Sequence, residues 1–139
     1  GTAMTTARLI QTYFSSLGAF LVLDAIWLGL ITPRFYRSQL GDLLADEVRW
    51  LPAVVFYLVF VAAVVVFAVA PAVERGSLGR ALLLGAFFGM VAYATYDLTN
   101  LATLRGFPTI VAAVDIAWGG VLTATVAAVG YLVGSRGAV

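Results

Sequence analysis

The chain has 139 residues, of which 63% are hydrophobic and 11% are charged, whereas soluble domains carry about 25% charged residues. A chain of this size cannot hide so much apolar surface in a soluble core, so its composition predicts a membrane protein. The net charge of +1 leaves no basic patch for nucleic acid. Cysteine, histidine and lysine are absent. Thiolate, imidazole and Schiff-base chemistry are therefore excluded, and acid–base chemistry must use carboxylates or tyrosines.

Four stretches are long and apolar enough to cross a bilayer as helices, which takes about 20 residues. We expect these spans at residues 9–31, 51–73, 78–104 and 108–133. Residues 1–3, before Met4, look like a cloning remnant, which leaves 4–139 as a single transmembrane domain. No small-residue cleavage site marks the first stretch as a signal peptide. The eight arginines divide four and four between the two sides, so they give no orientation.

The longest connection, residues 33–50, has a helical pattern of apolar residues with acidic residues between them. The apolar set consists of Tyr36, Leu40, Leu43, Leu44 and Val48. This pattern predicts an amphipathic helix in the membrane interface. A lid over the mouth of the bundle and a simple connector are equal alternatives. The predicted fold is an all-α bundle of four transmembrane helices with this interfacial segment between the first two.

Three aspartates lie inside the expected spans, where each costs roughly 2.5–3.5 kcal/mol on insertion. Asp24 lies nine residues before Pro33, Asp97 eight before Arg105, and Asp115 seven after a proline. At 1.5 Å per residue all three lie about 10–14 Å from the same membrane face. Tyr57 of the second span has a similar depth, so every span contributes a polar group to one layer. Such a layer favours a functional site over scattered hydrogen-bonding aspartates.

Neighbouring residues extend this layer. Tyr93, Tyr96, Asp97 and Asn100 share one face of the third span. Asp24 and Asp115 each begin the pattern Asp-x-x-Trp-x-Gly, which brings Trp27 and Trp118 into the prediction. Trp27 alternatively belongs to an interfacial aromatic belt. The predicted ligand-binding residues are Asp24, Trp27, Tyr57, Tyr93, Tyr96, Asp97, Asn100, Asp115 and Trp118.

The strings LDAIWLG, FYR, YDLTNLAT and VDIAWGG occur at residues 23–29, 35–37, 96–103 and 114–120. With them the chain resembles a family of small bacterial four-helix integral membrane proteins of unknown function. The resemblance covers nearly the whole chain. It implies a multi-pass protein of the bacterial cytoplasmic membrane and supplies no reaction.

Three functions suit such a layer. The first is binding or transport of a small hydrophobic, lipid-like or cationic ligand, with aromatic walls and aspartates that orient a polar head. The second is a membrane enzyme acting on a lipid or apolar substrate, with Asp24, Asp97 and Asp115 as candidates for an acid–base pair. The third is proton- or cation-coupled transport, with Asp97, Asn100 and Asp115 as oxygen ligands. Four helices are few for a transport path, so that version calls for a homodimer. We favour the first function and expect membrane lipid as a partner, with no cofactor and no resident metal.

Overall fold

The fold is described by a computed structural model, in which residues 3–136 can be described. The expected domain end at 137–139 and the first two residues of the expected cloning remnant lie outside this part. All the described elements are helical and follow one another as α1 (Thr6–Leu30), the π-turn η1 (Thr32–Tyr36), α2 (Arg37–Leu40), the 3₁₀ turn η2 (Gly41–Leu43), α3 (Trp50–Val64), the π-turn η3 (Val65–Val69), α4 (Ala70–Arg75), α5 (Leu78–Thr103) and α6 (Thr109–Gly134).

Four helical segments are long and apolar enough to cross a membrane, which confirms the predicted four-span fold. They are Thr6–Leu30, Trp50–Arg75, Leu78–Thr103 and Thr109–Gly134. The predicted ends lie within three residues of the observed ends. The second span contains η3 in place of a regular α-turn. Pro71 follows η3 and has no N–H to donate to the carbonyl four residues back, which is consistent with a wider turn at this point.

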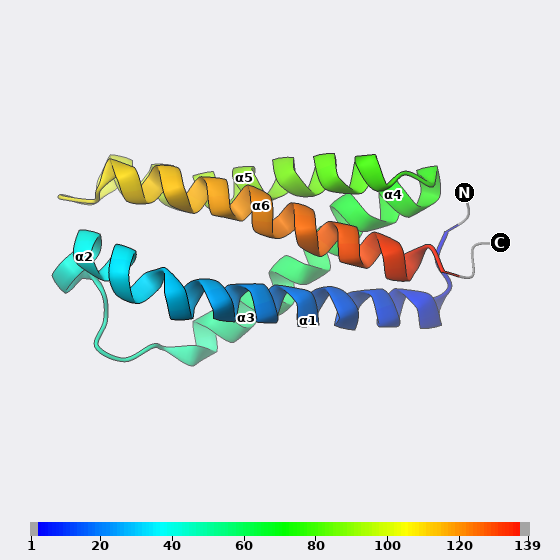
Figure 1. Cartoon of the computed structure of the whole chain (residues 1–139), viewed down its shortest axis with the longest axis horizontal. Coiled ribbons are helices and arrows are strands. Elements are labelled where there is room, and N and C mark those ends of the chain that lie inside the picture. The colour runs from blue at the N-terminus through cyan, green and yellow to red at the C-terminus, as the bar shows by residue number, and fades with distance from the viewer. Residues whose placement is uncertain (1–2, 137–139) are drawn as a thin grey trace.

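Both described chain ends lie at one end of the bundle, and α2 lies at the other (Figure 1). We call this second end the loop end, because it carries residues 31–49 and 104–108. The helix of the first span continues through η1 and α2, until Gly41 ends α2 with a φ of 53°. Residues 44–49 form no helix. The placement of this segment in a membrane interface stays a prediction.

Helices α5 and α6 form an antiparallel hairpin with close backbone contact, which Gly85 and Gly89, one turn apart on α5, make possible. A Cβ atom on Gly85 would lie 2.7 Å from Cβ of Ala127, and one on Gly89 would overlap the side chain of Thr123. The same register places Tyr93 against Gly119. One further step of four residues brings Asp97 opposite Asp115.

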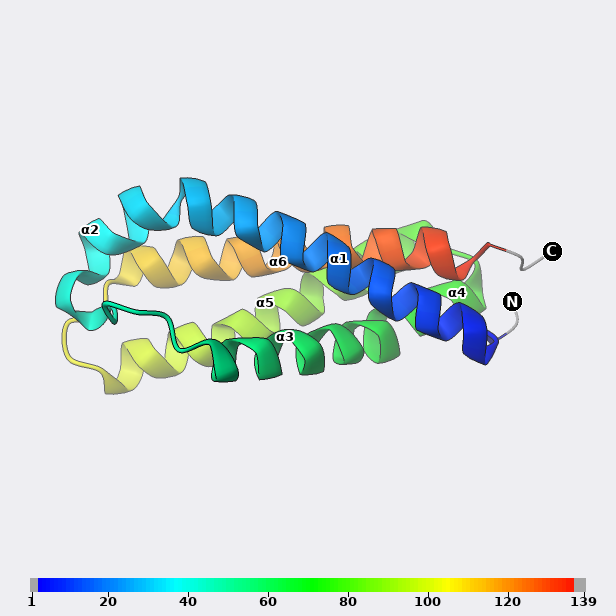
Figure 2. The same cartoon turned by 90° about the horizontal axis from the view of Figure 1, so that it is seen from below.

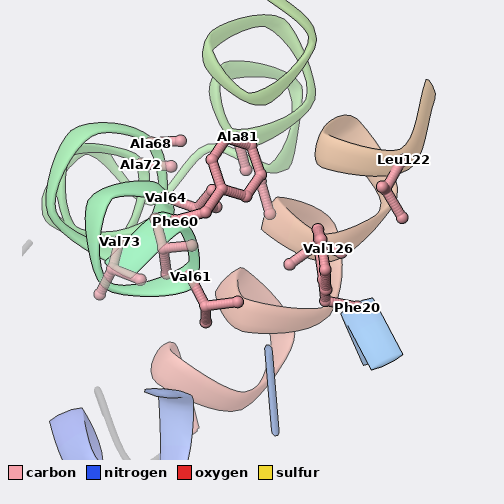
Figure 3. Close-up of a cluster of buried hydrophobic side chains, with 12 residues drawn as sticks. Phe20, Phe60, Val61, Val64, Ala68, Ala72, Val73, Ala81, Leu122 and Val126 are labelled. Carbon is pink, nitrogen blue, oxygen red and sulfur yellow. The ribbon is translucent and has the colours of Figure 1, made fainter. Parts of the chain in front are cut away.

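The apolar core fills the half of the bundle nearer the termini. Figure 3 shows Phe20, Phe60 and Val61 directed toward Leu122 and Val126, from the first, second and fourth spans. These five side chains are at most 5% exposed. At the loop end the helices diverge, and in Figure 1 the start of α3 lies on the opposite side of the bundle from α5. The apolar core therefore fills the bundle toward the termini and does not extend to the loop end.

Candidate functional site

A cavity of about 410 Å³ lies inside the loop end of the bundle. Asp24 of α1, Asp97 of α5 and Asp115 of α6 all line it, so the three intramembrane aspartates border one space. Its volume is within the range of about 300–1,000 Å³ that is usual for small-molecule sites. The lining contains no arginine, so no basic side chain of the wall balances the carboxylates.

Two tyrosines donate hydrogen bonds to two of the aspartates. The Tyr57 hydroxyl donates to Oδ2 of Asp24 over 3.0 Å, and the Tyr36 hydroxyl donates to Oδ1 of Asp115 over 2.8 Å. Tyr57 comes from α3 and was predicted from its depth. Tyr36 comes from η1, outside the spans. Each of these carboxylates thus has one phenol donor.

Asp97 has no such donor. Its side chain is fully buried, and neither carboxylate oxygen has a hydrogen-bond partner. The Asp115 carboxyl lies within hydrogen-bonding reach, but that bond needs a proton on one of the two acids. An ionised carboxylate in a buried site without a donor is costly. The arrangement therefore suits a carboxyl–carboxylate pair with one proton.

Trp27 and Trp118 stack face to face, with ring centroids 4.2 Å apart and planes 7° from parallel. Trp27 is thus part of the cavity wall. Each tryptophan follows its aspartate by three residues on antiparallel helices, so the stack separates Asp24 from Asp115 by about 9 Å along the bundle. The acidic groups therefore lie at two levels, where a single layer was predicted. The depth count took Pro33 as the helix end, but helical structure continues through η1 and α2.

We call the level nearer the loop end the upper level and the level nearer the apolar core the lower level. Asp24 and Tyr57 form the lower level. Asp97, Asp115 and Tyr36 form the upper level. The indole N–H of Trp118 is buried between the levels and has no hydrogen-bond partner of suitable geometry, although Asp24 is close. This N–H is a free donor inside the site. A ligand with an acceptor atom could satisfy it.

Tyr36 is buried at the loop end and contacts Trp27 with a ring-centroid distance of 6.2 Å. Burial raises the pKa of the Tyr36 phenol above its ordinary value, and the neighbouring Asp115 charge adds to the shift. The phenol therefore stays neutral and remains a donor to Asp115 well into the alkaline range.

The segment between the first two spans covers the cavity. Tyr36, Leu40 and Leu44 all belong to its lining. This contact favours the lid over the simple connector. The hydroxyl of Tyr36 fixes the lid to α6 through Asp115.

The cavity also extends sideways between α3 and α5. A second space of about 420 Å³ is lined by Phe56, Ala92, Tyr93, Tyr96 and Asp115, and four of these five residues also line the first cavity. Tyr96 is 62% exposed. Below this opening, Phe60 reaches Tyr93 with a ring-centroid distance of 6.1 Å. In a bilayer such an opening faces the lipid chains.

Eight of the nine predicted binding residues line the cavity, and Asn100 does not. Asn100 shares the helical face of Asp97 but lies nearly a turn beyond it toward the loop end, where the lining comes from Phe107 and the lid. The sequence prediction missed the role of Tyr36 and the apolar wall residues Phe56 and Val111. The signal for Tyr36 was its place in the string FYR. Within residues 3–136 no group of three acidic residues is arranged to hold a metal ion.

Residues 9–132 match a family described as a predicted membrane protein, DUF2177. No curated protein matches the chain significantly. No solved structure matches it either.

Proposed function

Because this chain belongs to the DUF2177 family of predicted membrane proteins, we propose that it is a multi-pass protein of the bacterial inner membrane that binds an amphiphilic molecule with an apolar tail and a cationic head. The observation that carries this proposal is a partly open cavity with three carboxyl groups and no basic side chain in its wall. Membrane lipid is the expected source or carrier of the ligand.

The head-group chemistry follows from charge and aromatic surface. Carboxylates held in a low-dielectric site attract a cation more strongly than they do in water. Tyrosine and tryptophan rings stabilise an organic cation through their faces, by about 2 kcal/mol or more when the cation is desolvated. A hard metal ion fits less well, because Asn100, the third oxygen ligand of the cation hypothesis, does not line the cavity. An alkylammonium head satisfies both the carboxylates and the rings.

The tail chemistry follows from the opening between α3 and α5. Its wall is formed by Phe56, Ala92 and the rings of Tyr93 and Tyr96. A hydrocarbon chain there can remain in contact with lipid while the head lies at the upper carboxylates. This route supports a ligand that enters from the bilayer.

Binding is favoured over transport because the core blocks the bundle below the cavity. Phe20, Val61, Leu122 and Val126 are completely buried there. A path across the membrane would need this packing to open, or a second copy of the chain. The enzyme alternative has one specific support, the contact between Asp97 and Asp115, because two close acids that share a proton can provide an acid and a base.

The test uses octyltrimethylammonium as the probe and 2,2-dimethyldecane, its uncharged carbon isostere, as the matched control. The protein carries Trp50→Phe, which leaves only the cavity tryptophans, Trp27 and Trp118, as indole fluorophores. In phosphatidylcholine nanodiscs we expect saturable quenching or a spectral shift of the indole fluorescence with the cation and none with the isostere.

Asp115→Asn should weaken binding of the cation about tenfold or more. Glu74→Gln, an exposed acid at the opposite end, should leave it unchanged. Equal responses to the two probes would overturn the cationic-head proposal.

A further inference from the structure

We propose that Asp97 and Asp115 hold one proton between them in the empty cavity, and that binding of a cation expels this proton to the aqueous phase. The inference rests on the proposed function and adds to it that cation and proton compete for one site. The protein then binds its ligand in exchange for a proton.

The first support is the environment of Asp97. Its carboxyl is fully buried and has no donor, while Asp115 already accepts from Tyr36. One proton on Asp97 gives that acid a hydrogen bond to Asp115 and removes an unpaired charge. Two ionised carboxylates in contact would repel each other without any buried cation in the wall. A single shared proton relieves both costs.

The second support is that the wall offers no other neutralising group. The titratable residues lining the cavity are Asp24 from α1, Tyr36 from η1, Tyr57 from α3, Tyr93, Tyr96 and Asp97 from α5, and Asp115 from α6. Each of these groups is either neutral or negative. Asp24 lies at the lower level with its own donor, Tyr57. Only a proton or a bound cation can therefore balance the second charge of the upper pair.

The exchange balances in charge. In the empty state the upper pair carries one proton and one negative charge. A quaternary ammonium brings one positive charge, and the O–H bond on the pair breaks as its proton passes to water beyond the lid. The pair then carries two negative charges and faces one cation. The total charge of the site is unchanged, which keeps the cost of burying the cation low.

The experiment measures proton release and binding in the same sample. Octyltrimethylammonium has no proton to lose, so any proton released comes from the protein. We expect about one proton per bound cation in weakly buffered nanodiscs with a pH indicator, because the proposed pair holds a single proton in the empty cavity. By linkage, the affinity of the Trp50→Phe protein should rise about tenfold per pH unit wherever the pair is protonated.

Asp97→Asn supplies a permanent N–H donor to Asp115 and has no proton to exchange. This variant should release no proton, and its weaker binding should not depend on pH. Glu74→Gln should behave like the parent, and Asp115→Asn gives an independent second variant should Asp97→Asn fail to fold. Binding of the parent without proton release, at an affinity independent of pH, would overturn the exchange while leaving the proposed function intact. Absence of any binding would overturn the proposed function itself.

Discussion

The hydroxyl of Tyr36 donates a 2.8 Å hydrogen bond to Asp115, although 79 residues separate the two in sequence. This bond joins the segment above the cavity to α6. It also brings a titratable group of the lid into contact with the upper acidic pair, which makes the stability of the lid sensitive to alkaline pH.

Replacing Tyr36 with phenylalanine should remove this sensitivity. Burial raises the pKa of the folded-state phenol above the unfolded value of about 10, so the native state holds the proton more tightly. The phenol's contribution to stability is complete below about pH 10 and decreases as the pH rises toward the folded-state pKa. The unfolding free energy of the parent, measured by SDS titration in mixed micelles, should therefore fall more steeply above pH 10 than that of Tyr36→Phe. Equal slopes would contradict the buried position of this phenol.

The stack of Trp27 on Trp118 should give a measurable coupling energy. Close aromatic pairs contribute about 0.5–1.5 kcal/mol beyond the area they bury. A double-mutant cycle with Trp27→Leu and Trp118→Leu, followed by SDS unfolding, should return a value in this range. The same cycle with Trp50→Leu in place of Trp27→Leu should return none, because Trp50 is 62% exposed at the start of α3. Additive effects of Trp27→Leu and Trp118→Leu would show that the two rings do not stack.

The interface between α5 and α6 should not accept an added methyl group at Gly89. In Gly89→Ala the new Cβ would overlap the carbonyl oxygen of Gly119 and the side chain of Thr123, so we expect a loss of about 1–3 kcal/mol of stability. Gly18→Ala is the matched control in α1, where no heavy atom lies within 4 Å of the added Cβ. That change should be neutral or stabilising by up to about 1 kcal/mol, since alanine favours a helix. Similar effects at the two positions would argue against the close interface.

Filling the opening between α3 and α5 should affect ligands according to their tails. Ala92 lines the side space but not the main cavity. Ala92→Trp should therefore weaken binding of octyltrimethylammonium several-fold and change binding of tetramethylammonium little, as measured by fluorescence in the Trp50→Phe background with a matching blank for the added indole. Ala102→Trp places the same side chain at an exposed position of α5 outside both spaces. An equal loss for both probes would place the tail elsewhere.

The spans and most of the acidic site could be predicted from the sequence because both depend on local patterns. Hydropathy located the four helices, and counting residues from their ends identified Asp24, Asp97 and Asp115 as candidates for one site. These features need only helix geometry and the cost of burying charge. The contact between Asp97 and Asp115 follows from the register of the α5–α6 hairpin, which only the structure supplies.

The remaining features depend on how the connections fold. The depth of each aspartate was estimated by counting residues from the expected helix ends. Because helical structure continues past Pro33, this count placed Asp24 too near the loop end, and the two acidic levels were predicted as one layer. The hydrogen bond from Tyr36 depends on the path of η1 across the cavity, and periodicity contains no information on that path. Asn100 was included because helical spacing places it on the same face as Asp97. Helical spacing does not show that Phe107 and the lid, rather than Asn100, line the cavity beyond Asp97.

The four spans pack unequally, with α5 and α6 in much closer contact than any other pair. Helices α5 and α6 are in backbone contact along their glycines, whereas Figure 2 shows the start of α3 well separated from α1 and α6 at the loop end. We therefore expect a molecule that enters from the bilayer to displace the first turns of α3, with the π-turn η3 and Pro71 farther along the same span as the point where that span bends. The acidic pair lies on α5 and α6, which we expect to stay in place. Tails of different lengths would then be accommodated without a change in the geometry that recognises the head.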